Sequence, residues 1–222
     1  MPEALGFDIY GTLVDPLEMN EHLGPLVGDD LADRFSELWR NKQIEYTFRH
    51  GLMRQYEDFG SCTRRSLVHT TRVLGVDLSK KDRENLVEEY QNLKPFPDVI
   101  PGIEALEARG HALVAFSNGV EATARTLLDR AGILPHLRDV ISVDDVKTFK
   151  PDPEVYHYLV HRLGEKLDKT WLVSSNPFDV IGAKAAGLKA AWIKRNPDAV
   201  FDPWGIEPDL TAPDLKAFVE KL

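Results

Sequence analysis

The chain has 222 residues, 43% of them hydrophobic and 28% charged, which is the composition of an ordinary globular protein with a sizeable core. Its 36 Asp and Glu residues outnumber its 27 Lys and Arg residues. The resulting formal net charge of −9 repels phosphate backbones and anionic lipid. We therefore expect neither a nucleic acid nor a membrane surface as a partner.

The cellular location is also constrained by the sequence. A single cysteine, Cys62, excludes an internal disulfide framework and fits a reducing compartment. The longest apolar run covers residues 112–116, far short of the ~20 residues needed to span a bilayer. Residues 1–4 lack the basic start and apolar stretch of a signal peptide. We expect a cytoplasmic protein.

The first part of the chain predicts one strand followed by a long helical segment. Residues 5–9 form a short apolar run that is typical of a buried strand. Residues 16–94 contain no convincing strand, and apolar residues such as Leu31 and Phe35 recur there at helical spacing. The proline-rich segment 94–98 then predicts a stiff return to the strand-containing part.

From residue 95 onward, short apolar runs alternate with helical patterns that end at glycines. Repeated strand–helix units predict an α/β fold, with a Rossmann-like parallel sheet and helices on both faces. We expect a core formed by residues 1–15 and 95–222, and a helical cap formed by residues 16–94. The expected strands are 112–116, 140–143, 171–173 and 190–193, and the expected helices are 120–131, 153–163 and 179–186.

Four of the expected strands lead into polar residues. Asp8 lies at the end of the first strand, residues 117–118 follow the second, Lys150 lies beyond the third, and residues 174–179 follow the fourth. Any one of these segments could be a helix N-cap. Because ligands bind at the carboxyl ends of the strands in an open parallel sheet, the four together predict one active site.

These segments resemble the haloacid dehalogenase-like superfamily over essentially the whole chain. Residues 8–13 read DIYGTL, residues 117–119 read SNG, and residues 174–179 read SSNPFD. Most members of the superfamily are magnesium-dependent phosphatases with Asp-x-Asp-Gly-Thr first and Gly-Asp-x-x-x-Asp last. Here Tyr10 replaces the acid of the first motif, and residues 174–175 replace Gly-Asp.

The departures match one subfamily, the L-2-haloacid dehalogenases. The cap segment 39–47, WRNKQIEYT, and the segment 149–156, FKPDPEVY, are also similar to motifs of that subfamily. Tyrosine is a poor proton donor at neutral pH, and losing a carboxylate weakens a magnesium site. Both changes argue against phosphoryl transfer, which depends on metal neutralisation of the phosphate.

The residues of the motifs permit displacement of halide from carbon. Aspartate is already ionised at pH 7, so Asp8 can attack without a base. The resemblance implies attack at C2 with inversion, an ester on Asp8, and hydrolysis of that ester by a water that Asp179 orients or activates. Lys150 would keep both carboxylates ionised, and Arg40 of the cap would bind substrate and stabilise the departing halide. We predict conversion of short (S)-2-haloacids to (R)-2-hydroxy acids, with no metal and no organic cofactor.

The remaining site residues are assigned by the resemblance and by position. Ser117 and Asn118, expected at a helix start, would present donors to the substrate carboxylate. Hydrogen-bonding support for Asp8, Lys150 and the water would come from Thr12, Tyr156, Ser174 and Asn176. The pocket for the halogenated carbon would be lined by Tyr10, Asn41, Ile44, Phe59 and Phe178. Asn41 is commonly Gln and Phe178 commonly Trp in the subfamily, so we expect a changed size range of substrates.

Three other functions stay open at the level of the sequence. The chain could be a phosphatase of the same superfamily, or it could use the same mechanism to open a strained ring such as azetidine-2-carboxylate. It could also be a non-catalytic binding protein on this scaffold. Halide is the expected product beside the hydroxy acid, and a homodimer is implied only by the resemblance.

Overall fold

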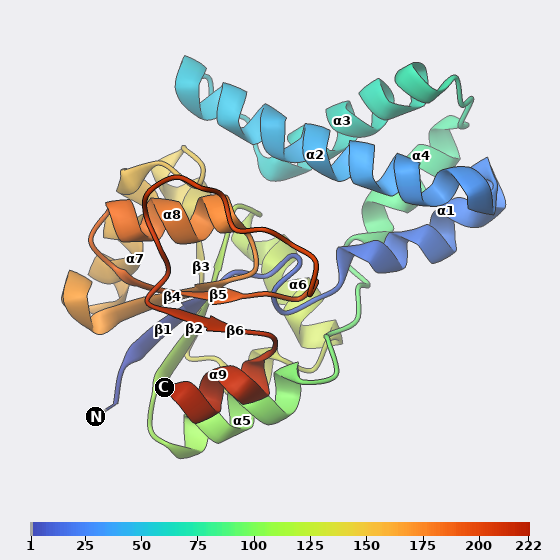
Figure 1. The fold of residues 1–222 in the computed structure, drawn as a ribbon. Helices are drawn as coiled ribbons and strands as arrows, with labels where there is room; N and C mark the ends of the chain where they lie inside the picture. The colour runs from blue at the N-terminus through green and yellow to red at the C-terminus, as the bar shows by residue number, and fades with distance from the viewer. Residues whose placement is uncertain (1) are drawn as a thin grey trace.

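A single sheet of six parallel strands forms the centre of the molecule in the computed structural model, which describes residues 2–222 (Figure 1). The strand order is β3-β2-β1-β4-β5-β6. The strands are β1 (Ala4–Phe7), β2 (Ala112–Ser117), β3 (Asp139–Ser142), β4 (Thr170–Ser174), β5 (Lys189–Ile193) and β6 (Leu210–Ala212). The predicted α/β fold is confirmed.

Helices cover both faces of this sheet. Figure 1 shows α7 (Pro153–Leu163) and α8 (Pro177–Ala185) on one face, and α5 (Val99–Ala108) and α9 (Leu215–Lys221) on the other. The helix α6 (Glu121–Arg130) connects β2 to β3. No helix among residues 2–222 is long and apolar enough to span a bilayer.

The strand β1 lies at the centre of the sheet, between β2 and β4, and all four of its residues are buried. A Cβ on Gly6 would lie 2.8 Å from Leu159 Cδ2, so the glycine permits close packing of α7 on the strand. Connections from β1 run to one side of the sheet, and the chain crosses to the other side between β3 and β4. The end of β1 is therefore the topological switch point where ligands bind in such sheets.

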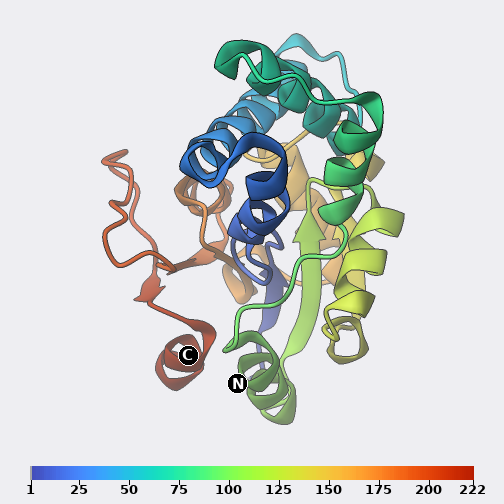
Figure 2. The same ribbon diagram turned by 90° about the vertical axis from the view of Figure 1, so that its right-hand side faces the viewer.

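Four helices lie between β1 and α5 in the chain. They are α1 (Met19–Val27), α2 (Asp29–Met53), α3 (Phe59–Leu74) and α4 (Lys80–Glu89). Figure 2 shows them beyond the end toward which the arrow of β2 points. We call α1–α4 the cap helices. The two segments that connect them to the sheet lie side by side, because Asp15 N donates to Lys94 O at 3.2 Å and Phe96 N donates to Leu13 O at 3.1 Å. The domain boundaries at 15/16 and 94/95 stay a prediction.

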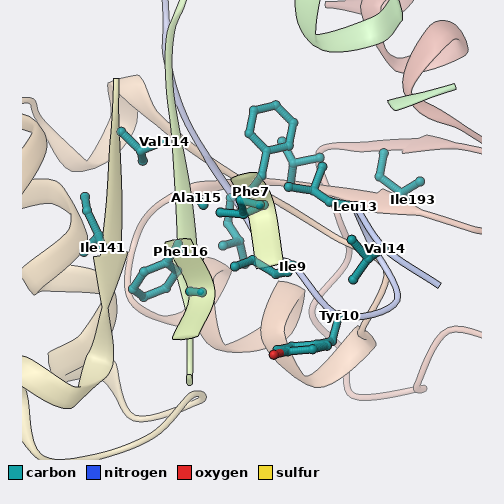
Figure 3. Packing of buried hydrophobic residues seen from close by; sticks show 14 of the residues in the cluster. Phe7, Ile9, Tyr10, Leu13, Val14, Val114, Ala115, Phe116, Ile141 and Ile193 are labelled. Carbon is teal, nitrogen blue, oxygen red and sulfur yellow. The ribbon is translucent and has the colours of Figure 1, made fainter. Parts of the chain in front are cut away.

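The first strand is shorter than the sequence predicts, since it ends at Phe7 rather than at residue 9. The amide of Asp8 still donates to Val173 O at 3.0 Å, but the carbonyl of Ile9 then accepts the amides of Thr12, Leu13 and Val14. This turn takes the chain out of the sheet directly after Asp8. Figure 3 shows Phe7 and Ile9 among the buried hydrophobic residues, and Tyr10 on the segment that follows them.

Other boundaries also differ from the prediction. The helix after β2 begins at Glu121, one residue later than expected, and its N-cap is Val120 rather than Ser117 or Asn118. The strand β3 covers 139–142 instead of 140–143, because Val143 already begins a short 3₁₀ turn. The sequence interpretation missed α5, β6 and α9. Helices 153–163 and 179–186 are observed, the second beginning two residues earlier, at Pro177.

Candidate active site

Asp8 lies at the switch point, and its two carboxylate oxygens have different surroundings. Oδ2 accepts hydrogen bonds from Asn176 Nδ2 at 2.7 Å, Thr12 Oγ1 at 3.0 Å and Ser174 Oγ at 3.3 Å. Among residues 2–222, Oδ1 accepts a hydrogen bond only from Lys150 Nζ, at 3.1 Å. One oxygen is thus fully engaged by neutral donors, whereas the other keeps lone-pair capacity.

Lys150 joins Asp8 to the second carboxylate of the site. Its fully buried ammonium donates to Asp8 Oδ1, to Asp179 Oδ2 at 2.8 Å and to Phe116 O at 2.9 Å. Three donors meet three acceptors, so the ammonium is completely satisfied. Tyr156 Oη donates to the other oxygen of Asp179 at 2.8 Å. The strands and the loop before α7 therefore bring the predicted residues Asp8, Lys150, Tyr156 and Asp179 together.

Burial and neighbouring charges shift the pKa values of Lys150 and Asp179. Burial acts to lower the pKa of Lys150, but the adjacent carboxylates of Asp179 and Asp8 raise that pKa above its usual value, so the side chain is a cation. Burial raises the pKa of Asp179, while Lys150 opposes the rise. A carboxylate with a raised pKa is a stronger base than an ordinary aspartate, which suits activation of water.

Ser117 and Asn118 lie at the end of β2, beside the Lys150 loop. Asn118 Oδ1 accepts the backbone amide of Lys150 at 3.0 Å, and Ser117 Oγ accepts the amide of Gly119 at 2.9 Å. Asn118 therefore holds the loop that carries the ammonium. Because the helix begins only at Glu121, the polar groups at this position belong to the loop and its side chains, and their role toward a substrate carboxylate stays a prediction.

Arg40 reaches from α2 to the turn after β1. Its Nη2 lies 3.4 Å from Tyr10 O, which also accepts Asn176 Nδ2 at 3.3 Å. Tyr10 is buried, and its ring stacks on Phe59 of α3 with centroids 5.8 Å apart. Burial raises the pKa of the Tyr10 phenol well above its usual value. This hydroxyl therefore stays protonated and cannot serve as a base.

The other predicted pocket residues, Phe178, Ile44 and Asn41, lie on different helices and differ in exposure. Phe178 is the second residue of α8 and packs edge-on against Phe48 of α2, with centroids 5.2 Å apart. Together with Lys150 it lines a cavity of about 760 Å³ between α2 and α8, but Asp8, Tyr10 and Arg40 are not among the residues that line it. Ile44 is half-buried on α2, and Asn41 is exposed there. Their place on the substrate pocket stays a prediction.

Three residues around the site received no role from the sequence. Arg195 donates to Thr12 O at 2.6 Å and pairs with Asp98 at 2.6 Å, which ties the turn after β1 to the start of α5. Gln43 and Thr63 connect α2 to α3 behind Arg40. Gln43 follows Arg40 by three residues, a helical spacing that indicates contact and could have drawn attention to it.

Comparison with known proteins places the chain among enzymes. The family model of haloacid dehalogenase-like hydrolases matches residues 2–187. Haloacetate dehalogenase H-2 of Moraxella sp. (strain B) is 38% identical over 220 residues, which is 98% of this chain and 96% of the relative. The (S)-2-haloacid dehalogenase of Pseudomonas sp. (strain YL) is 35% identical over 221 residues, or 98% and 93% of the two chains.

A solved structure has the same fold along its length. The L-2-haloacid dehalogenase of Xanthobacter autotrophicus, with chloropropionic acid covalently bound, matches with a TM-score of 0.90 and 28% identity. The match covers 99% of this chain and 98% of the other.

Proposed function

The chain belongs to the haloacid dehalogenase-like hydrolases, and from that membership we propose that it converts short (S)-2-haloacids to (R)-2-hydroxy acids and halide. The observation that carries this proposal is the Asp8 carboxylate, held by neutral donors on Oδ2 and by Lys150 alone on Oδ1. Displacement at carbon needs a nucleophile that is ionised and unshielded on one side.

In the first step, Asp8 Oδ1 attacks C2 of the substrate from the face opposite the halogen. A C–O bond forms, the carbon–halogen bond breaks, and the halide leaves with the electron pair, so C2 is inverted. The donors on Oδ2, Thr12, Ser174 and Asn176, fix the orientation of the carboxylate for this attack. A fixed geometry lowers the entropy cost of reaching the transition state.

In the second step, water attacks the carboxyl carbon of the Asp8 ester. Asp179 takes the proton of that water, and Tyr156 and Lys150 hold the Asp179 carboxylate in place. The acyl C–O bond then breaks, the remaining proton of the water passes to the departing alkoxide oxygen, and the hydroxy acid leaves. The Asp8 carboxylate is restored, and Asp179 releases its proton to solvent. Ser175 stands where a magnesium phosphatase carries its metal-binding acid, which favours hydrolysis of this ester over phosphoryl transfer.

Arg40 supplies the positive charge for the anions. The substrate carboxylate and the departing halide both carry negative charge into a site that already holds two carboxylates and one ammonium. Arg40 donates only to neutral oxygens, so its charge is available to them. The same proposal includes a metal-independent reaction, a cytoplasmic location, which the lone buried Cys62 supports, and a homodimer, which rests on the subfamily resemblance.

Halide release tests the function. Purified protein with a chelator is expected to release chloride from (S)-2-chloropropionate and to form the (R)-hydroxy acid, measured by ion chromatography and chiral chromatography. Release of phosphate from phosphate esters on addition of magnesium, with no halide from any short haloacid, would identify a phosphatase instead. Turnover of azetidine-2-carboxylate, with no halide from any haloacid, would identify the ring-opening hydrolase instead.

Phe178 is expected to set the size range of substrates. Phe178 directly precedes Asp179, so the larger ring of Phe178→Trp should narrow the space beside the reacting carboxylates, and turnover of 2-chlorobutyrate should fall about 10-fold relative to chloroacetate. The measurement is the ratio of kcat/KM values for the two substrates. Val200→Leu, on an exposed loop residue, should leave the ratio unchanged. An unchanged ranking in the Trp variant would remove Phe178 from the substrate pocket.

A further inference from the structure

Arg40 is held by a buried chain of hydrogen bonds within the cap helices. Arg40 Nη1 donates to Gln43 Oε1 at 3.0 Å, and Gln43 Nε2 donates to Thr63 Oγ1 at 2.6 Å. Thr63 Oγ1 in turn donates to Phe59 O at 2.9 Å. Gln43 and Thr63 are both buried, so neither amide nor hydroxyl has water as an alternative partner.

The direction of every bond in this chain is fixed. A guanidinium only donates, so the oxygen of the Gln43 amide must face Arg40 and the nitrogen must face Thr63. The Thr63 hydroxyl then donates its hydrogen bond to Phe59 O. Turning the amide over would place NH₂ against a guanidinium. The chain therefore specifies one orientation for the Arg40 side chain.

Apart from the Arg40 guanidinium itself, the groups in this series of hydrogen bonds are uncharged, which matters for a site that binds anions. None of the ion pairs formed by residues 2–222 includes Arg40, and the two oxygens that accept its hydrogen bonds, Gln43 Oε1 and Tyr10 O, are uncharged. A carboxylate in place of Gln43 would orient the guanidinium equally well, but it would neutralise the charge that the substrate needs. A neutral amide orients the cation and leaves its charge available.

This series of hydrogen bonds also leads back to the turn after β1. Phe59, whose carbonyl ends the chain, stacks on Tyr10, and the carbonyl of Tyr10 is the second acceptor of Arg40. Arg40, Gln43, Thr63, Phe59 and Tyr10 thus form a closed ring of contacts that crosses from the cap helices to the turn after β1.

We propose that Gln43 and Thr63 are positioning residues that act through Arg40: they fix its guanidinium, uncompensated, for the substrate carboxylate and the departing halide. The inference rests on the proposed dehalogenase function. Thr63 acts only through Gln43, and neither residue touches the reacting atoms.

The leaving group distinguishes this role from a merely structural one. Chloride is a poorer leaving group than bromide and needs more stabilisation, so a misplaced Arg40 penalises chloride more. Gln43→Leu is expected to lower kcat/KM for (S)-2-chloropropionate about 10- to 100-fold, the range for a lost hydrogen bond to a charged group. The ratio of kcat/KM for (S)-2-bromopropionate to that for the chloro substrate should rise several-fold. Gln43→Glu should raise KM for both substrates through neutralisation of Arg40.

A double-mutant cycle tests the order of the chain. Thr63→Val should shift the bromide-to-chloride ratio in the same direction, Thr63→Ser should retain the wild-type ratio, and Thr63→Val should add nothing in the Gln43→Leu background. Thr71→Val is the matched control, because Thr71 is a buried α3 residue whose hydroxyl donates to Val68 O at 2.9 Å, away from Arg40. Its ratio should equal that of the wild type.

Three results would overturn the inference: a wild-type ratio in Gln43→Leu, additive effects of the two substitutions, and an equal shift in Thr71→Val. Thermal unfolding of each variant shows whether it folds, and if Gln43→Leu does not, Thr63→Val and Gln43→Glu decide. A wild-type protein that releases no halide would defeat the proposed function itself, whereas active wild type with unresponsive variants would defeat only the role of Gln43 and Thr63.

Discussion

Asp8→Asn is expected to lower halide release by about 10⁴-fold or more, since removal of a covalent nucleophile leaves only binding and electrostatic stabilisation. The amide retains the shape of the carboxylate, and its oxygen can still accept bonds from Thr12, Ser174 and Asn176. Its NH₂ group then faces Lys150 Nζ, which keeps Asp179 Oδ2 and Phe116 O as acceptors. It carries no negative charge to attack carbon. The loss should therefore appear in activity with the fold intact, as measured by halide assay beside circular dichroism.

The ester intermediate makes this prediction specific to chemistry at Asp8. In a single turnover with enzyme in excess in ¹⁸O-water, the label should enter the Asp8 carboxylate of the wild type, because water attacks that carbon and not C2. Mass spectrometry of the peptide containing Asp8 detects it. Label found directly in the hydroxy acid, with none in the peptide, would show that water attacks the substrate.

Asp15→Asn is the matched control for this substitution. Asp15 follows the same turn, and its carboxylate accepts Leu17 N at 2.9 Å, a bond that an asparagine oxygen can also accept. Activity should be unchanged within a factor of about two, because Asp15 lies outside the group formed by Asp8, Lys150 and Asp179.

The meeting of Asp8, Lys150 and Asp179 could be predicted from the sequence because the topology enforces it. Parallel strands end at one edge of the sheet, so polar residues directly after β1 and β4 must lie close together. Lys150 is brought there by a loop beyond β3 whose residues matched a known motif. The central strands could also be predicted, because strands buried on both faces appear in the sequence as continuous apolar runs.

Other features depend on tertiary contacts that carry no periodic signal. The bonds from Gln43 to Thr63 and from Arg195 to Thr12 join residues 20 and 183 positions apart. The strand β6 has three residues, pairs only with β5 and is partly exposed, which leaves too short an apolar pattern to recognise. Neither Ser117 nor Asn118 caps α6, because Ser117 Oγ accepts the amide of Gly119 and Asn118 Oδ1 accepts the amide of Lys150.

Lys150→Met is expected to destabilise the protein by about 3–5 kcal/mol at pH 8 and to abolish turnover, because it leaves two buried carboxylates without their cation. Phe116 O also loses its donor. Urea unfolding of variant and wild type gives the difference in the free energy of unfolding. Lys166→Met, at an exposed residue, should change that free energy by less than about 0.5 kcal/mol.

The pH dependence of this loss identifies its cause. Without the ammonium, Asp8 and Asp179 repel each other, and the pKa of at least one of them rises above its value in the unfolded chain. Between those two pKa values the folded variant binds more protons than the unfolded chain, so its free energy of unfolding increases as the pH falls through the raised pKa. The deficit relative to wild type should therefore be smaller at pH 5.5 than at pH 8. An equal deficit at both pH values would mean that lost packing of the lysine stem, and not the unpaired carboxylates, destabilises the variant.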